Sequence, residues 1–264
     1  MKVLCFGSLN IDYVYSVDHF VAKGETLASS GLEVFTGGKG LNQSIALAKA
    51  GTEVYHAGAI GPDGKFLLDA MDKAGVNTDY VSVLTTERSG NAIIQRNKDG
   101  DNGILLYGGT NQMITTAQVD DVLSHFSAGD YLILQNEINQ LPYIMEKAHE
   151  KGMVIVLNPS PMNEKILACD LKKVSMFLMN EDEGMAITGK EEAADILAAM
   201  TEMYPEAQTV LTLGSKGSVY QGKGRTIEQK AFRVKAVDTT AAGDTFTGYF
   251  VAGLVRGDNI PNAL

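Results

Sequence analysis

The stretch Asp238-Thr-Thr-Ala-Ala-Gly-Asp244-Thr-Phe-Thr-Gly248 joins a strand-like segment, 232–237, to a helix-like run over 245–255. Its small side chains let a ligand approach the backbone closely. A helix that begins here offers unpaired N–H groups and a partial positive charge, which favour a bound anion such as phosphate. Asp244 stands at the rim of this predicted anion site, placed to take a proton from an attacking hydroxyl. The structural alternative is that Asp244 caps the helix.

Apolar strand-like runs alternate with helix-like segments through most of the chain. Strands are predicted over 3–6, 54–60, 131–134, 154–157, 176–179 and 209–213. Helices are predicted over 41–50, 65–74, 141–151, 182–188 and 191–203. This alternation indicates an α/β fold with a mostly parallel central sheet that helices flank on both faces.

Two β-rich segments, 12–35 and 91–107, fall outside this alternation. Within the second, Asp99-Gly100-Asp101-Asn102 is a hairpin signal between strand-like runs. We expect these segments to form a small β-sheet lid beside one main domain, the whole spanning residues 1–264. Its edge strands need partners, so a homodimer through the lid is a second expectation.

Composition excludes several classes of protein. The 264 residues carry a net charge of −10, which argues against a nucleic-acid partner because phosphate backbones require clustered Lys and Arg. A nucleotide remains possible, since backbone N–H groups and a metal ion can hold its phosphates. Cys5 and Cys169 are the two cysteines, and no apolar run is long enough for a signal peptide or a membrane span. We therefore expect a cytoplasmic protein with no membrane partner.

Polar residues suited to binding a sugar follow several predicted strands. In Gly37-Gly38-Lys39-Gly40-Leu41-Asn42-Gln43 the glycines permit close approach of a ligand, and Lys39 and Asn42 can donate hydrogen bonds to hydroxyls. Asn10, Asp12 and Glu137 come directly after strands, at the sheet edge where α/β proteins bind ligands. An ordinary glycine turn and ordinary Asn/Asp turn chemistry are the structural alternatives.

Two later segments are suited to a nucleotide. Asn180-Glu181-Asp182-Glu183 follows a strand and also has the helix-capping pattern, Asn with Glu three residues later. Its functional interpretation places Asn180 and Glu183 near phosphates, with Glu183 holding Mg²⁺ through water. The segment Thr212-Leu-Gly214-Ser-Lys-Gly217 is either a tight hairpin or a contact for nucleotide phosphate or ribose. Spacing alone decides neither case.

These segments, together with Gly7-Ser-Leu-Asn10-Ile-Asp12 and Asn158-Pro-Ser-Pro161, occur in one chain in one order. In that combination the chain resembles the ribokinase-like (phosphofructokinase-B type) family of sugar and nucleoside kinases. The resemblance implies a central α/β domain, a small β lid and ATP-dependent phosphorylation of a sugar. Family members usually continue for several tens of residues beyond the helix that starts at Asp244, and that part normally supplies a wall of the adenine pocket.

The resemblance also assigns roles to residues. The sugar-binding residues that it implies are Asn10, Asp12, Gly38, Lys39, Gly40, Asn42 and Glu137. The residues that it places at the nucleotide are Asn180, Glu183, Thr212, Gly214, Ser215, Gly217 and Gly243. The anion hole consists of Ala241, Ala242 and Gly243, with Asp244 as the base. Asp238 and the backbone of Thr240 would bind a monovalent cation such as K⁺.

The expected reaction is in-line transfer of the ATP γ-phosphoryl group to a primary hydroxyl of a pentose, ribose in the first place. Another sugar, a sugar phosphate or a nucleoside is the alternative acceptor. A non-catalytic sugar-binding protein is the alternative from another class.

Overall fold

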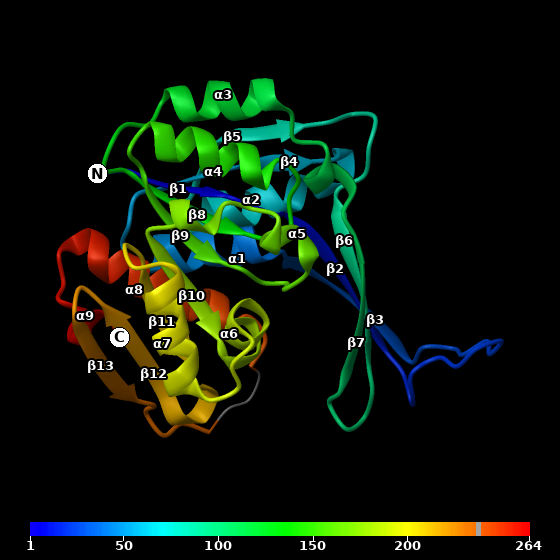
Figure 1. The fold of residues 1–264 in the computed structure, drawn as a ribbon. Helices are drawn as coiled ribbons and strands as arrows, with labels where there is room; N and C mark the ends of the chain where they lie inside the picture. The colour runs from blue at the N-terminus through cyan, green and yellow to red at the C-terminus, as the bar shows by residue number, and fades with distance from the viewer. Residues whose placement is uncertain (236–238) are drawn as a thin grey trace.

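A large, mostly parallel sheet forms the centre of the computed structural model, which describes residues 1–235 and 239–264 (Figure 1). Within these residues the sheet has nine strands in the order β13-β12-β11-β10-β9-β8-β1-β4-β5. The seven parallel strands are β1 (Val3–Phe6), β4 (Val54–Ile60), β5 (Asn77–Val83), β8 (Tyr131–Gln135), β9 (Val154–Asn158), β10 (Met176–Asn180) and β11 (Gln208–Thr212). Because they run in one direction, their carboxyl ends share one edge of the sheet.

The far edge of the sheet is antiparallel. Strand β12 (Gly217–Gly222) pairs with β11 across a short 3-10 turn, η4 (Gly214–Lys216), and β13 (Arg225–Lys230) pairs with β12. The hairpin interpretation of the Thr212–Gly217 segment is therefore confirmed. The strand predicted over 232–237 is wrong in its described part, because 232–235 pairs with no strand and is exposed. Its last two residues lie outside the described part of the chain.

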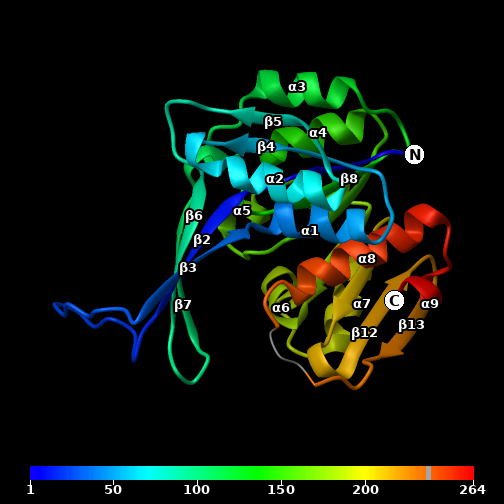
Figure 2. The ribbon, with the colours of Figure 1, turned by 180° about the vertical axis from the view of Figure 1, so that it is seen from behind.

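Helices cover both faces of the sheet, as predicted. Their bounds are α1 (Lys39–Lys49), α2 (Lys65–Ala74), α3 (Thr116–Ser124), α4 (Leu141–Glu150), α5 (Glu164–Leu167), α6 (Glu181–Thr188), α7 (Ala193–Met203), α8 (Ala242–Arg256) and α9 (Ile260–Ala263). Apolar residues of α3 to α7 form one core and those of α1, α2 and α8 the other. Figure 1 shows the first layer and Figure 2, from behind, the second. Strand β1 serves both cores because successive side chains point to opposite faces.

Helices α1 and α8 lie against each other at an unusually close approach. Gly248 on α8 faces Ala46 of α1, and a Cβ at Gly248 would collide with the Ala46 side chain and come within 2.9 Å of the Leu47 amide. Glycine is therefore required where the two helices cross. This contact brings the start of α8, and Asp244 with it, beside the start of α1.

A second, smaller sheet extends away from the main domain (Figures 1 and 2). Its strand order is β3-β2-β6-β7, from β2 (Asn10–Ser16), β3 (Gly31–Gly37), β6 (Gly90–Arg96) and β7 (Asn102–Tyr107). The two predicted lid segments thus pair with each other through β2 and β6, which are parallel. Consecutive apolar side chains of β7, from Ile104 to Tyr107, are exposed.

Several elements were not predicted from the sequence. They include β5, α3, the antiparallel strands β12 and β13, and the short helices α5 and α9. Strand β5 has half-buried and polar residues throughout, so it lacks the apolar run typical of a buried parallel strand. No helix in residues 1–235 and 239–264 is both long enough and apolar enough to span a lipid bilayer.

Candidate active site

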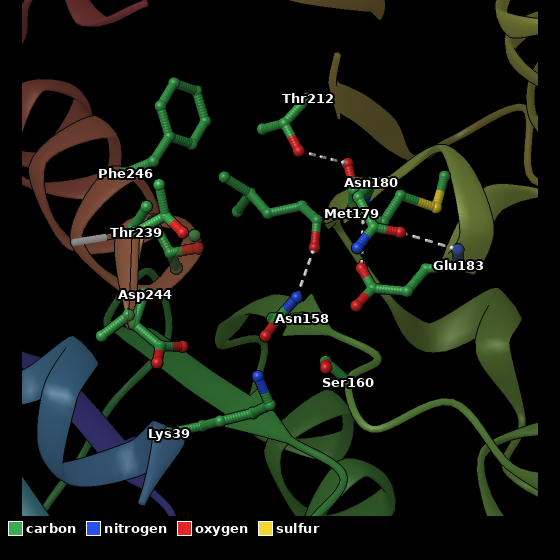
Figure 3. Close-up of a pocket in the computed structure, with 15 residues that line it drawn as sticks. Lys39, Asn158, Ser160, Met179, Asn180, Glu183, Thr212, Thr239, Asp244 and Phe246 are labelled. Atoms are coloured by element: carbon green, nitrogen blue, oxygen red, sulfur yellow. Dashed lines mark hydrogen bonds between the residues drawn. The ribbon is translucent and has the colours of Figure 1, made fainter. Parts of the chain in front are cut away.

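Asp244 lies at the carboxyl edge of the main sheet, on the first turn of α8, and its side chain is 6% exposed. It lines a cavity of about 230 Å³ together with Lys39 from α1 and Asn180, Glu183 and Thr212 from the β10–β11 region. Figure 3 shows these side chains around one space. The sheet therefore brings together residues separated by up to about two hundred positions in the chain.

Two adjacent amides of α1 hold the Asp244 carboxylate. Asn42 Nδ2 donates to Oδ2 at 3.2 Å, and Gln43 Nε2 donates to Oδ1 at 2.9 Å. The N-cap of α8 is Ala241, and Asp244 stands three residues later, in the first turn. Its carboxylate is bonded by Asn42 and Gln43 and lines the cavity, so Asp244 is not the N-cap of the structural alternative.

The turn before α8 has the geometry of an anion site. Ala241 adopts a left-handed conformation (φ 57°), which turns the chain into the helix. The Ala242 amide donates to the Thr239 carbonyl at 3.2 Å. In the part of the chain that the structure describes, the amides of Gly243 and Asp244 have no acceptor, and Gly243 lines the cavity. Free amides at a helix start, beside a carboxylate, suit a phosphoryl group approached by a hydroxyl.

Glu137 lies next to the first residue of α1, Lys39. Its Oε2 accepts hydrogen bonds from the Lys39 backbone amide at 2.9 Å and from the Ser8 hydroxyl. The Ser8 hydroxyl also accepts from the Gly40 amide at 3.2 Å. One carboxylate oxygen of Glu137 is thereby fixed, which leaves Oε1 to accept from a ligand.

Asn10 has its amide orientation fixed by Asn111. The Asn111 side chain is 2% exposed and donates through Nδ2 to Asn10 Oδ1 at 2.7 Å. It also accepts from the Leu9 amide at 3.0 Å, so its own orientation is set by the backbone. Asn10 therefore presents its NH₂ group, a donor, to the second cavity of about 280 Å³ that it lines with Glu137.

Asp12 stands on β2 near Glu137, at the base of the lid. Burial and the negative charge of Glu137 together raise the pKa of Asp12 to about 6. Gly37 on β3, which pairs with Asn10, has no side chain, and a Cβ there would overlap the Asp12 carboxylate. Two carboxyl groups at one site are able to accept several sugar hydroxyls.

The predicted glycines of the first glycine-rich segment have a structural reason. Gly38 has φ 94°, which L-residues rarely adopt, at the residue before α1. At Gly40 a Cβ would stand 2.5 Å from the Ser8 amide and 2.6 Å from Gly7. The close approach at Gly40 is thus to the chain's own backbone, which lets α1 start against the end of β1.

Asn180 and Glu183 form a complete capping box at the start of α6. The Glu183 amide donates to Asn180 Oδ1 at 2.8 Å, and the Asn180 amide donates to Glu183 Oε2 at 3.0 Å. The helix-capping interpretation is confirmed, and both residues also line the cavity with Asp244 (Figure 3). The hydrogen bond that Glu183 accepts within the described residues is to Oε2, so its Oε1 is not used in the capping box.

The Thr212–Gly217 segment borders a third, mainly apolar cavity of about 290 Å³. Thr212, Gly243 and Phe246 line both this cavity and that of Asp244, so the two adjoin. Gly214 and Gly217 line the apolar cavity, whereas Ser215 is exposed on η4 and lines none of these cavities. A polar cavity that continues into an apolar one has the form of a nucleotide site.

Comparison with known proteins identifies the family. Residues 1–264 match the pfkB family carbohydrate kinases. The chain belongs to this family. It is 34% identical to the ribokinase of Haemophilus influenzae over 267 residues, which covers 98% of this chain and 87% of that protein. Ribokinase from Cryptococcus neoformans var. grubii serotype A in complex with ADP has a TM-score of 0.85 at 33% identity, covering 100% of this chain and 90% of that one.

A second solved structure, Arabidopsis thaliana ribokinase complexed with ribose and ATP, has a TM-score of 0.86 at 28% identity and covers 99% of this chain and 88% of that one. The predicted fold class, a ribokinase-like α/β sheet with a small β lid, is thereby confirmed. The protein is a carbohydrate kinase, that is, a phosphotransferase with an alcohol group as acceptor.

Several residues of this carbohydrate kinase site were not assigned from the sequence. They are Ser8, Gln43, Asn111, Gln135 and Asn158. Gln43 and Asn158 stand inside segments that carried the resemblance, which was a usable signal. Asn111 and Gln135 have no such signal, because their partners are fixed by long-range packing.

The structure describes one of the two residues predicted to bind a monovalent cation. Asp238 lies outside the described residues, and Thr240 is exposed in the turn before α8. No group of three or more His, Cys, Asp or Glu side chains with metal-ligand geometry occurs in the described ranges. Both cation assignments therefore stay predictions.

Proposed function

We propose that the protein is an ATP-dependent ribokinase, which transfers the γ-phosphoryl group of ATP to a primary hydroxyl of ribose. The observation that carries the proposal is the buried Asp244 carboxylate at the start of α8, beside free helix amides and opposite Lys39. Ribose is the named substrate of relatives that match nearly the whole chain. Residues 1–264 act in this proposal as one kinase domain with a lid.

Ribose lies in this proposal between β2, α1 and Glu137. Asn10 donates to a sugar hydroxyl, since Asn111 already occupies its oxygen. Asp12 and Glu137 accept hydrogen bonds from hydroxyls. Lys39, which lines the Asp244 cavity, and Asn42 donate to further hydroxyls in this proposal. Gly38 and Gly40 shape the turn that places these donors. Five oriented groups around a small polyol give selectivity, because each unpaired buried group costs binding free energy when a hydroxyl is missing.

Asp244 removes the proton of the attacking hydroxyl as its oxygen bonds to phosphorus, and the bond to the ADP oxygen breaks. The amides of Gly243 and Asp244 stabilise the charge on the transferring phosphoryl group. Ala241 and Ala242 shape the turn that presents these amides. The lid covers the acceptor and excludes water, so that phosphoryl transfer is favoured over hydrolysis of ATP.

The nucleotide lies in this proposal from the Asp244 cavity into the adjoining apolar cavity. Its phosphates reach Asn180 and Thr212, and its base and ribose reach Gly214, Gly217 and the exposed Ser215. Glu183 is suited to hold Mg²⁺ through water, because one of its oxygens is free while phosphates supply the inner ligands. Mg²⁺ when bound neutralises the phosphate charge.

Three further elements complete the proposal. Asp238 and the Thr240 backbone bind K⁺ near the anion site. The exposed apolar strand β7 and the lid edges pair with a second copy, giving a homodimer. The buried, unpaired Cys5 and Cys169 suit the reducing cytoplasm.

An acceptor screen tests the proposal directly. ADP release is measured in a coupled assay with ribose, 2-deoxyribose, fructose, ribose 5-phosphate and adenosine. We expect the highest kcat/KM for ribose. A higher value for another acceptor would overturn the ribose assignment. Ribose binding by calorimetry without any ATP-dependent turnover would support a non-catalytic sugar-binding protein instead.

A further inference from the structure

Beneath Asp244 lies a chain of side-chain amides that faces away from solvent. Gln43 is fully buried, and its Nε2 donates both to Asp244 Oδ1 at 2.9 Å and to Asn158 Oδ1 at 3.2 Å. Its Oε1 accepts from Gln135 Nε2 at 2.7 Å. Every polar hydrogen and the oxygen of the Gln43 amide is thus used within this buried network.

A backbone carbonyl anchors one end of the network, and this anchor sets the orientation of Asn158 and then of Gln43. Asn158 Nδ2 donates to the Leu178 carbonyl at 2.9 Å. Asn158 must therefore present its oxygen to Gln43, and Gln43 in turn must present its NH₂ group. An NH₂ group donates only, so Asp244 Oδ1 is held as an acceptor and stays in the buried layer.

The second oxygen of Asp244 is in a different environment. Among the described residues its partner is Asn42, which is half-buried and bonds at a longer 3.2 Å. Asn42 lines a separate cavity of about 280 Å³ with Ala241 and Thr245. The two oxygens are therefore not equivalent: Oδ1 is bonded by a fully buried amide and Oδ2 by a half-buried one.

We propose that Gln43 is a positioning residue for the phosphoryl transfer, holding Oδ1 of Asp244 so that Oδ2 is the oxygen that takes the proton from the acceptor hydroxyl. This inference rests on the proposed kinase function. Gln43 does not touch the substrate; it sets the plane of the carboxylate through one hydrogen bond. Gln135 and Asn158 keep the Gln43 amide in the required orientation.

A substitution of Gln135 can separate an effect on the orientation of the Gln43 amide from an effect on the stability of the fold. Among the described residues, the buried Gln135 Oε1 has no hydrogen-bond partner, so the amide is costly to the fold even while its Nε2 orients Gln43. Met at position 135 preserves the volume and removes the unsatisfied oxygen. Gln135→Met should therefore keep or raise the melting temperature while it loosens Gln43.

The experiment compares Gln43→Met, Gln135→Met and wild type, with ATP and ribose. We expect kcat to fall roughly 10- to 100-fold in Gln43→Met. We expect KM for ribose and ATP to stay near wild type, and Gln135→Met to show a smaller kcat loss without a lower melting temperature. Tyr220→Phe is the control, because it removes a hydrogen bond of a buried side chain on β12, to Gln208, that lies outside this network.

A double-mutant cycle with Asp244→Asn completes the test. If Gln43 acts through Asp244, Gln43→Met causes no further loss of the residual kcat in the Asp244→Asn background. Wild-type kcat in a folded Gln43→Met, or an equal loss in both backgrounds, would overturn the inference. Failure of the proposed function is a separate outcome, since it shows as absent ribose turnover in the wild-type protein.

Discussion

The two halves of the active site differ in how far they are built before any ligand binds. On the sugar side, Asn10, Glu137 and Asp244 each have an oxygen fixed by a buried donor. On the nucleotide side, the segment 231–235 has no regular structure, and Phe232 and Val234 are 81% and 82% exposed. The proposed acceptor half is thus preorganised, whereas in the proposed donor half exposed apolar side chains remain for the nucleotide to cover.

The largest expected effect comes from a substitution of Asp244, which lies between the acceptor half and the donor half of the site. Asp244→Asn keeps the shape of the side chain but removes the base, so kcat should fall about 10²- to 10⁴-fold. Ribose affinity, measured by calorimetry, should change little, because the preorganised acceptor half remains. A variant with wild-type turnover would show that another group accepts the proton.

A smaller effect is expected from pH on the acceptor half. The pKa of Asp12, raised to about 6 by burial and by Glu137, predicts that ribose affinity falls as pH decreases through about 6. Protonation converts an acceptor of sugar hydroxyls into a donor. Calorimetry from pH 5 to pH 8 tests this, with Asp12→Asn as the control in which this dependence disappears. A pH-independent wild-type affinity would remove Asp12 from the sugar site.

Asp12 also makes a prediction about stability, with a defined sign. Its folded-state pKa lies above its usual 3.8, so the folded protein binds this proton more tightly than the unfolded chain does. The contribution of Asp12 to the free energy of unfolding is therefore greatest in acid and is lost as pH rises through about 6. Asp12→Asn should raise stability at pH 8 by about 1–2 kcal/mol, and much less at pH 4. Thermal melts at both pH values measure the difference.

The smallest effect is expected on the nucleotide side. Phe246 lines both adjoining cavities and stacks on Phe250, with ring centroids 5.9 Å apart. Phe246→Ala should raise KM for ATP by less than about tenfold, since a partly exposed ring loses about 1 kcal/mol of apolar contact with the nucleotide. KM for ribose should stay unchanged. An effect on ribose and none on ATP would reverse the assignment of the two halves.

The sequence was most informative where a local pattern has a local cause. The capping box of Asn180 and Glu183 was predicted from spacing of three residues and is present. Likewise, the lid segments followed from hairpin and strand patterns. By contrast, Gln43 and Gln135 are 92 residues apart, and only the packing of α1 on the sheet brings them together. The strand predicted over 232–237 was wrong in its described part, 232–235, where Phe232 and Val234 are exposed instead of paired.

Gly248 has a consequence for the way the enzyme moves. With no side chain between them, α1 and α8 pack closely enough for Asn42 and Gln43 to hydrogen-bond Asp244. We expect this alignment to persist when a substrate binds, and closure to come instead from the outlying small sheet. Catalytic alignment is in that case constant throughout the cycle, and substrate entry and departure change only the covering of the site.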